Sequence, residues 1–308
     1  MLRPLVLLVL ACGLGYGLGC ADAPADGPTP SAVTDDLGRA VTVDLPADRV
    51  LALAPSLTEA LFAAGAGATL VGASHADDHP PGLDRLPRYG TYPLDLEAVV
   101  ALRPDLVLAT DQVNSPRDAE ALAEAGVPTY FFRFDEVADV PAAVRTLGRL
   151  TGTEATADSA ARALEARFER VRARTADRPR PRTLLLIGDE ELFAFGDASY
   201  TQALIRLAGG ESLTAGFEGE NVTLQDEWVL EAQPEVIVGA FGADYAPERL
   251  LALHPAWRNL PAVRAGRVHG MDPDLLLRPG PRLVEGAERL AALLHPDAPV
   301  DTLQAGRG

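Results

Sequence analysis

Two stretches, one in each half of the chain, repeat the same pattern: EAVVALRPDLVLA at residues 97–109 and EWVLEAQPEVIVG at residues 227–239. Each stretch begins with a glutamate, Glu97 or Glu227, and each has a proline seven residues later. An acidic residue and a run of branched apolar residues follow the proline. The pattern predicts a short helix, a turn at the proline and a buried strand in both places.

The separation of the two copies indicates the architecture. More than a hundred residues lie between them, which is too long a period for a solenoid. We therefore expect two similar α/β lobes, each with one glutamate at a matching position. Two lobes enclose a cleft, and a carboxylate on each lip of a cleft is typical of a ligand carrier that docks on a basic partner.

Strands and helices alternate along both halves, which predicts parallel sheets covered on both faces. The expected strands of the first half are RVLALAP, TLVGAS, LVLAT and TYFFR, and those of the second half are RTLLLIG, VIVGA and RVHGM. The expected helices begin at Ser56 and lie at about 96–102, 115–125, 138–150, 199–208, 226–232, 246–252 and 281–294. The predicted fold class is α/β, with two Rossmann-like lobes that have parallel sheets. The residues from His75 to Asp95 show neither the helical nor the strand period, which predicts a long loop. Long ordered loops are often functional.

Residues 154–177 predict one long helix between the lobes. An apolar stripe with helical spacing runs along it, and at 1.5 Å per residue the helix would be roughly 35 Å long. Pro179 and Pro181 end it. The stripe consists of Ala157, Ala160, Ala161, Leu164, Phe168 and Val171. We expect this single spine helix to restrict how far the lobes close.

The N-terminus has the features of an export signal. Arg3 precedes an apolar run, and small residues lead to Cys20. This arrangement resembles a bacterial lipoprotein signal, in which the cysteine becomes the lipid-carrying first residue; an ordinary signal peptide cut nearby is the alternative. The interpretation places the protein outside the cytoplasm, in the periplasm or on the cell surface, held on a membrane by a lipid anchor.

The expected domain boundaries follow from these features. Residues 1–20 are the signal peptide and residues 21–40, rich in Ala, Pro and Asp, are a flexible tether. We expect an N-terminal lobe over 41–153, the linking helix over 154–178, a C-terminal lobe over 179–298 and a loose tail over 299–308.

Composition excludes several function classes. The formal net charge is −17 at pH 7, every basic residue other than histidine is arginine, and the chain after Cys20 has no cysteine. Thiol catalysis, lysine-dependent catalysis and cysteine-based metal sites are therefore ruled out. The acidity argues against nucleic acid and anionic lipid as partners.

With the order of elements in place, the chain resembles a class III periplasmic substrate-binding protein of an ABC importer. It is most similar to the vitamin B12-binding members, with iron-siderophore and haem binders next. The resemblance covers about residues 49–296. The matching segments are RVLALAPSLTEALFAAGAG, LVGASHADDHPPGLDRLP, DLEAVVALRPDLVLAT, the EWVLEAQPEVIV repeat and DPDLLLRPGPRLVEGAERLAALLHP.

This resemblance implies functional residues. Glu97 and Glu227 match the two glutamates with which such carriers dock on the permease dimer, although acids are also favourable at helix starts. The implied ligand contacts are Tyr92, Thr110 and Asp111 in the first lobe and Phe193, Asp274 and Arg278 in the second. Tyr92 stands where similar B12 binders have a large aromatic residue, whereas Thr110 stands where they can have tryptophan. Arg278 could instead saturate a helix end.

The resulting hypothesis is a monomeric, non-catalytic carrier without a cofactor of its own. Its ligand is a small-molecule metal chelate: a corrinoid is preferred, and a ferric siderophore or haem is the alternative. A chelate scavenger that works without an importer is a third hypothesis for the protein. An exported α/β hydrolase lacks support because no G-x-S-x-G motif is present. We interpret His75 and His79 as polar loop residues rather than metal ligands, and His254, His269 and His295 as surface or element-end residues.

Overall fold

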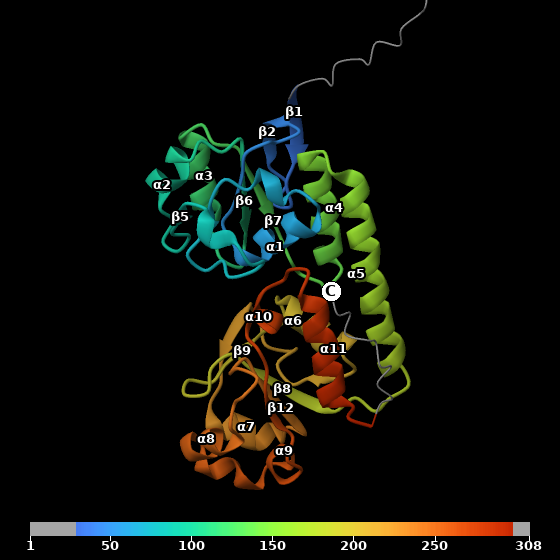
Figure 1. Cartoon of the computed structure of the whole chain (residues 1–308). Coiled ribbons are helices and arrows are strands. Elements are labelled where there is room, and N and C mark those ends of the chain that lie inside the picture. Colours follow the sequence, from blue (N-terminus) through green and yellow to red (C-terminus); the bar gives the residue numbers. More distant parts are fainter. Residues whose placement is uncertain (1–28, 298–308) are drawn as a thin grey trace, which may run out of the picture.

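The structure, a computed structural model, describes residues 29–297. Two α/β lobes follow one another along a long helix, α5 (Glu154–Thr175), which runs beside both of them (Figure 1). The predicted fold class is confirmed, and the predicted spine helix over 154–177 differs from α5 only at its last residues. Within residues 29–297, none of the helices has both the length and the apolar character that a membrane crossing requires.

The N-terminal lobe is built on a parallel sheet with the strand order β3-β6-β7. These strands are β3 (Val50–Ala52), β6 (Leu106–Thr110) and β7 (Thr129–Phe132). Its helices are α1 (Pro55–Ala63), α2 (Leu96–Ala101), α3 (Pro116–Glu124) and α4 (Asp139–Thr151), with short 3-10 turns η1 (Gly67–Thr69) and η2 (Leu83–Arg85). A second parallel pair consists of β4 (Ala73–Ser74) and β5 (Arg88–Tyr89), so the segment expected as an irregular loop contains a strand.

A β-hairpin precedes this lobe and corrects one expectation. Strands β1 (Thr29–Thr34) and β2 (Ala40–Leu45) pair antiparallel, and the backbone N–H of Asp36 donates to the carbonyl of Phe131 at 3.1 Å. The flexible tether predicted over 21–40 is therefore too long, because 29–40 belong to the lobe. The Ala, Pro and Asp content concealed β1, whose residues are exposed or half-buried and which is ordered by pairing with β2. Residues 1–28 lie outside the described part.

The C-terminal lobe has a mixed sheet with the strand order β11-β9-β8-β12-β13. The parallel strands are β8 (Arg182–Leu186), β12 (Val236–Gly239), β13 (Val268–Gly270) and β10 (Glu211–Ser212), which pairs with β8. Strands β9 (Phe193–Phe195) and β11 (Asn221–Thr223) are antiparallel to their neighbours, and the sequence analysis did not anticipate them. The helices are α6 (Tyr200–Leu207), α7 (Asp226–Ala232), α8 (Pro247–Leu253), α9 (Pro261–Arg264), α10 (Asp274–Leu277) and α11 (Leu283–Leu294), with η3 (Pro255–Asn259) between α8 and α9.

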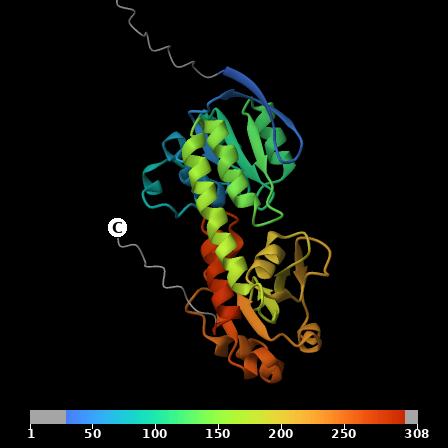
Figure 2. The same cartoon turned by 90° about the vertical axis from the view of Figure 1, so that its right-hand side faces the viewer.

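Helix α5 joins the two lobes through packing as well as through the chain. It lies against α4 in the first lobe and against α11 and α6 in the second, as Figure 2 shows from the side. Gly148 on α4 permits the close crossing, since a Cβ there would come within 2.4 Å of the Cβ of Ala157. One continuous apolar cluster includes buried residues of both lobes and of α5, such as Leu57, Phe168 and Leu290. A shared core of this kind resists large hinge motions between the lobes.

Candidate ligand-binding cleft

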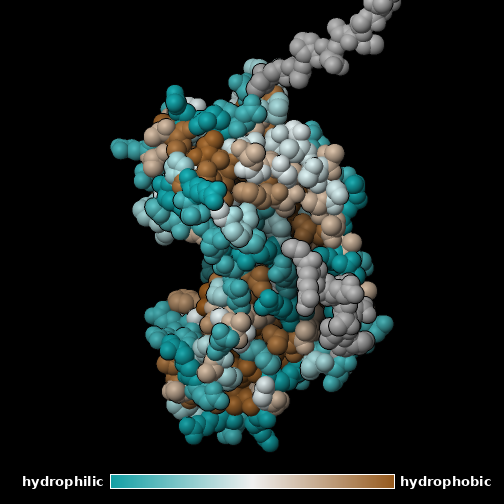
Figure 3. Space-filling view, viewed as in Figure 1, coloured by the Kyte–Doolittle hydropathy of each residue, from teal (hydrophilic) through white to brown (hydrophobic). Residues whose placement is uncertain are grey.

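A cavity of about 250 Å³ lies between the two lobes. Figure 3 shows that the molecular surface is hollowed between the two lobes. Its first-lobe lining is Ala54, Pro55, Ser56, Gln112 and Val113, and its second-lobe lining is Ile187, Phe195, Glu220, Asn221, Leu277, Arg278 and Pro279. Half of these residues lie within four positions after the ends of β3, β6 and β8, so the carboxyl ends of three parallel strands meet the cavity. Ligands of open α/β sheets bind at this edge.

The repeated helices α2 and α7 occupy matching places in the two lobes, because each directly precedes a parallel strand, β6 or β12. Glu97 and Glu227 are both in first turns and both exposed, while Val99 and Val229 two residues later are fully buried. The structure thus exposes one carboxylate in the first turn of α2 and one in the first turn of α7, and we call these two helix starts the rims of the lobes.

The turns after these helices are alike in detail. Arg103 and Gln233, each just before the repeated proline, have φ angles of 47° and 46°. The carboxylate of Asp105 accepts the backbone N–H of Arg49 at 3.0 Å. In the second lobe the carboxylate of Glu235 accepts the backbone N–H of Arg182 at 2.8 Å. The repeat seen in the sequence is a repeat of backbone geometry and of hydrogen bonding.

Thr110 does not line the cavity, although it was predicted as a ligand contact. Its side chain is fully buried at the end of β6, and its Oγ1 lies 3.3 Å from Oδ1 of Asp111. The side-chain amide of Gln112 donates to the same oxygen at 3.3 Å. Burial raises the pKa of Asp111 despite these hydrogen bonds. Thr110 therefore orients the carboxylate of Asp111 through a hydrogen bond. Gln112, which sequence reasoning missed, lines the cavity instead.

The two predicted aromatic contacts are exposed. Tyr92 is 88% exposed in the loop before α2, and Phe193 is 37% exposed on β9. Phe193 and Phe195 point to the same side of β9 because side chains alternate along a strand, and Phe195 lines the cavity. Phe193 thus shares a face of β9 with a lining residue without lining the cavity itself, and the structure shows no cavity contact for Tyr92.

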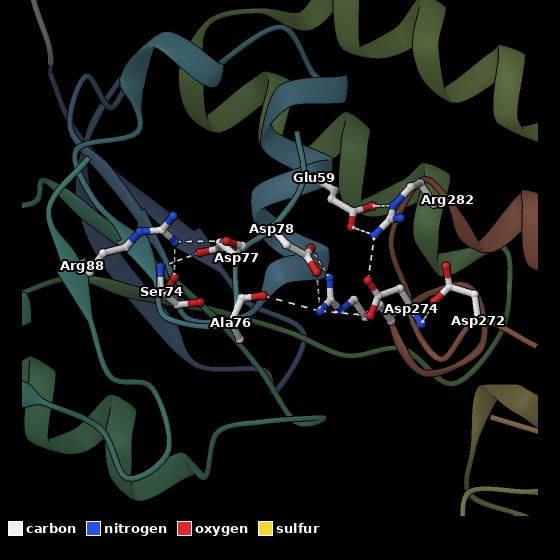
Figure 4. Close-up of polar contacts among 10 residues, drawn as sticks. Glu59, Ser74, Ala76, Asp77, Asp78, Arg88, Asp272, Asp274 and Arg282 are labelled. Atoms are coloured by element: carbon white, nitrogen blue, oxygen red, sulfur yellow. Dashed lines mark hydrogen bonds and ion pairs between the residues drawn. The ribbon is translucent and has the colours of Figure 1, made fainter. Parts of the chain in front are cut away.

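Asp274 and Arg278 belong to a cross-lobe ion network (Figure 4). Arg278 lines the cavity, yet its guanidinium pairs with Asp78 of the first lobe at 2.7 Å and with Asp274 at 3.0 Å. The hydrogen bond from Arg278 lowers the pKa of Asp78, whereas burial raises the pKa of Asp274. Arg278 therefore bridges the lobes, which corrects the alternative of an arginine that merely saturates a helix end.

Arg282 provides the second bridge of the network. It donates two hydrogen bonds to the carboxylate of Glu59 on α1, at 3.0 and 2.8 Å. It also approaches Asp274 at 3.5 Å. The Glu59 side chain is 2% exposed, so this is a buried, bidentate ion pair between the lobes. Neither Glu59 nor Arg282 was singled out from the sequence, because nothing in a linear pattern places them together.

The histidines differ in their environments. His75 and His79 are exposed in the loop after β4, and among residues 29–297 no group of three or more metal-binding side chains is present. His254, expected at the surface or at the end of an element, stands at the C-terminal end of α8 and is buried, stacked on Trp257 with ring centroids 4.5 Å apart. Its two ring nitrogens lie 2.8 Å from Asp226 and from the carbonyl of Asp189.

Comparison with known proteins supports a common origin for this architecture. A model of the periplasmic binding protein family matches residues 50–275. The chain is 26% identical over 303 residues to the uncharacterized ABC transporter substrate-binding lipoprotein YvrC of Bacillus subtilis, covering 95% of each chain.

Two solved structures extend the comparison. The periplasmic vitamin B12 binding protein BtuF of Vibrio cholerae superposes with a TM-score of 0.72 at 26% identity, covering 81% of this chain and 97% of that one. A periplasmic heme binding protein from Pseudomonas aeruginosa superposes with a TM-score of 0.72 at 28% identity, covering 82% and 94%. The similarity extends over both lobes in each case.

Proposed function

The chain belongs to the periplasmic binding protein family, and from this premise we propose that it captures a metal chelate, preferentially a corrinoid, and delivers it to an ABC importer. The observation that carries the proposal is the cavity assembled from both lobes at the carboxyl edge of their sheets, with an exposed glutamate at the rim of each lobe. A shared core and cross-lobe ion pairs keep this cleft nearly preformed, which favours tight binding.

The preference for a corrinoid rests on relatives and on two exposed aromatic side chains. BtuF of Vibrio cholerae, named for vitamin B12 binding, resembles this chain over both lobes. Tyr92 and Phe193 are among the large apolar side chains left exposed in the described chain, and a flat macrocycle would cover such rings. A haem or ferric-siderophore ligand is the second candidate, because the heme binding protein of Pseudomonas aeruginosa superposes equally well.

Titration calorimetry with cyanocobalamin, haemin and a ferric hydroxamate tests the ligand. We expect a Kd for cyanocobalamin between roughly 1 nM and 1 µM. Tyr92→Ala should weaken binding by about tenfold or more and Phe193→Ala by about fivefold, since each loses buried apolar area. Phe62→Ala is the matched control, because Phe62 is also 37% exposed but lies on α1 beside Gly67, not on β9 or in the loop before α2. Silence with cyanocobalamin and a clear haemin isotherm would assign the protein to the second candidate.

Docking is the second part of the proposal. We expect Glu97 and Glu227 to meet arginines on the two subunits of a permease dimer, where carboxylates form bidentate, charge-assisted pairs. The matching backbone and burial of α2 and α7 support equal roles in the two lobes. One monomer of this chain would then span both permease subunits.

The anchor completes the proposal. Cys20 lies outside the described residues, and its lipidation rests on the signal-like segment before it and on the likeness to YvrC, which is named a lipoprotein. A lipidated Cys20 would hold the carrier at a membrane outside the cytoplasm. Mass spectrometry of the native protein tests this, and an unmodified N-terminus downstream of Cys20 would contradict it.

A further inference from the structure

A buried histidine connects the start of α7 with the loop after β8. His254 stands between α8 and η3, and its side chain is 9% exposed. Its Nδ1 lies 2.8 Å from the carboxylate of Asp226, the first residue of α7, and its Nε2 lies 2.8 Å from the carbonyl oxygen of Asp189. The imidazole therefore joins two segments that are distant in the sequence, and Asp226 directly precedes Glu227.

The ring and the loop are themselves held in place. The imidazole of His254 stacks on the fully buried ring of Trp257 in η3. The carboxylate of Asp189 accepts hydrogen bonds from the guanidinium of Arg249 on α8 and from the hydroxyl of Tyr245 at 3.0 Å. The hydrogen bond from Arg249 lowers the pKa of Asp189. The loop after β8, α8 and η3 thus form one frame, which the imidazole extends to the first turn of α7.

The first lobe holds the matching helix in a different way. Asp95, the N-cap of α2, accepts the backbone N–H of Ala98 at 3.0 Å, so α2 is capped by its own chain. Gln225, the N-cap of α7, makes no side-chain capping hydrogen bond within the described chain. The first turn of α7 lacks the local cap of α2, and the contact between Asp226 and His254 holds it from outside.

The two contacts of the imidazole require two protons. A backbone carbonyl only accepts hydrogen bonds, and so does an ionised carboxylate. Both contacts of His254 are therefore hydrogen bonds only when both ring nitrogens carry a proton. A neutral imidazole has one donor and keeps one of the two contacts. The charged groups of this contact network are the carboxylates of Asp226, Asp189 and Glu190 and the guanidinium of Arg249.

We propose that His254, through Asp226, is a positioning residue of the second rim, which in its doubly protonated form fixes the first turn of α7 so that Glu227 meets its arginine on the permease. The inference rests on the proposed function and adds a proton-dependent element to docking in one lobe. His254 itself touches neither ligand nor permease, because its side chain is buried beneath α7. In the first lobe the same task belongs to Asp95, whose cap needs no histidine.

A double-mutant cycle on importer binding tests this role. Asp226→Ala removes the contact without opening the core, because the side chain is 41% exposed. It should weaken the complex with the importer in nanodiscs about two- to tenfold, the effect of one lost hydrogen bond. The full effect should persist in a Glu97→Ala background and fall below about 1.5-fold in a Glu227→Ala background, since an absent glutamate cannot be misplaced. A general loss of folding would weaken the complex equally in both backgrounds and would overturn the proposal.

The matched variant in the first lobe is Asp95→Ala. It removes the cap of α2, so its effect should vanish in a Glu97→Ala background and persist in a Glu227→Ala background. If removing both glutamates leaves the complex unchanged, the docking part of the proposed function fails. If removing them weakens the complex but Asp226→Ala is neutral, docking stands and the positioning role of His254 is overturned.

The conservative change Asp226→Asn tests the protonated form. The amide of the new side chain can donate to Nδ1 of a neutral His254 while Nε2 still donates to the carbonyl of Asp189. The importer affinity of the wild type should fall as the pH is raised, because the imidazole loses its second proton. Asp226→Asn should abolish this fall and stay within about twofold of the wild-type affinity at low pH. A variant as weak as Asp226→Ala would indicate that Asp226 acts by its charge alone, and that result, or an unchanged pH dependence, would overturn the proposal.

Discussion

The two lobes agree at their rims and differ at the wall of the cleft. At the rims, α2 and α7 share an exposed first-turn glutamate, a buried valine and a left-handed residue before a proline. At the wall, the first lobe contributes the turn after β6, whereas the second contributes β9, β11 and the loop that carries Glu220. No antiparallel strand of this kind joins the β3-β6-β7 sheet of the first lobe in the described residues.

This difference separates two kinds of task. A partner built from two like subunits requires two like contacts. The backbone geometry that the two lobes share supplies them at the rims. A ligand without two-fold symmetry requires unlike contacts, and added strands or altered loops supply those at the wall. The proposed docking therefore belongs to the repeated part of the molecule, and the proposed ligand selection belongs to the unrepeated part.

The largest expected effect comes from removing both rim carboxylates. Glu97→Ala with Glu227→Ala should abolish complex formation with the importer, because each truncation leaves a partner charge unpaired at a cost of about 2–5 kcal/mol. Ligand affinity in solution should stay within about threefold. Calorimetry of the free protein and pull-down with the importer in nanodiscs measure the two quantities separately.

The single variants sharpen the comparison between the lobes. Glu97→Ala and Glu227→Ala should weaken the complex to a similar extent if the rims play equal roles. Glu231→Ala, at an exposed position later on α7, is the control and should leave the complex unchanged. Loss of ligand binding in the double variant would place the glutamates in the pocket and refute the docking proposal.

The second-largest effect concerns the ion pair between Glu59 and Arg282, which joins the two lobes. Arg282→Met leaves the carboxylate of Glu59, whose side chain is 2% exposed, without its bidentate partner. Stranding one partner of a buried pair costs about 3–5 kcal/mol, so urea unfolding should show a loss of that size. Adding Glu59→Gln should recover part of the loss, because the buried charge is then removed.

An exposed cross-lobe ion pair provides the matched control for the buried pair between Glu59 and Arg282. Arg206 and Glu136 approach to 3.3 Å, but both side chains are 58% exposed. Arg206→Met should therefore cost less than about 1 kcal/mol. Equal losses in Arg206→Met and Arg282→Met would mean that the buried pair contributes nothing special to holding the lobes.

A smaller and symmetric effect is expected from the acids behind the repeated prolines. The carboxylates of Asp105 and Glu235 each accept one backbone N–H at the start of the neighbouring parallel strand, β3 or β8. Asp105→Ala and Glu235→Ala should each lower the free energy of unfolding by about 0.5–1.5 kcal/mol. Values that differ between the lobes by more than about 1 kcal/mol would break the structural equivalence proposed here.

Sequence reasoning succeeded where the signal is local and periodic. The apolar stripe of α5 and the repeated helix-proline-strand pattern depend on neighbours in the chain, so their elements could be predicted. The ordered hairpin at 29–45 was missed because short alternating strands with many small residues resemble a linker by composition. The same limit hid β9 and β11, each of which has three residues.

The candidate site was only partly predictable for a different reason. Arg278 follows from a matching motif and lines the cavity, whereas Phe193 lies two residues before the lining residue Phe195. The pairs Glu59–Arg282 and Asp78–Arg278 join positions in different lobes, and such proximity is fixed by the packing of α5 rather than by any pattern in the chain. Thr110 shows the converse, since its position along β6 is as expected but its side chain is fully buried.

The smallest effect tests whether the repeated turns carry the same backbone strain. Arg103 and Gln233 have φ angles of 47° and 46°, a region that costs residues with a Cβ about 1–2 kcal/mol. Glycine removes this cost but gains freedom in the unfolded chain, worth about 0.4–1 kcal/mol in the opposite direction. Alanine keeps the cost while deleting the same side-chain atoms, so it is the matched reference at each position. We expect the glycine variant to be more stable than the alanine variant by up to about 1 kcal/mol in both lobes, as measured by urea unfolding. An alanine variant more stable than its glycine counterpart in only one lobe would show that the two rims share a shape without sharing the strain that comes with it.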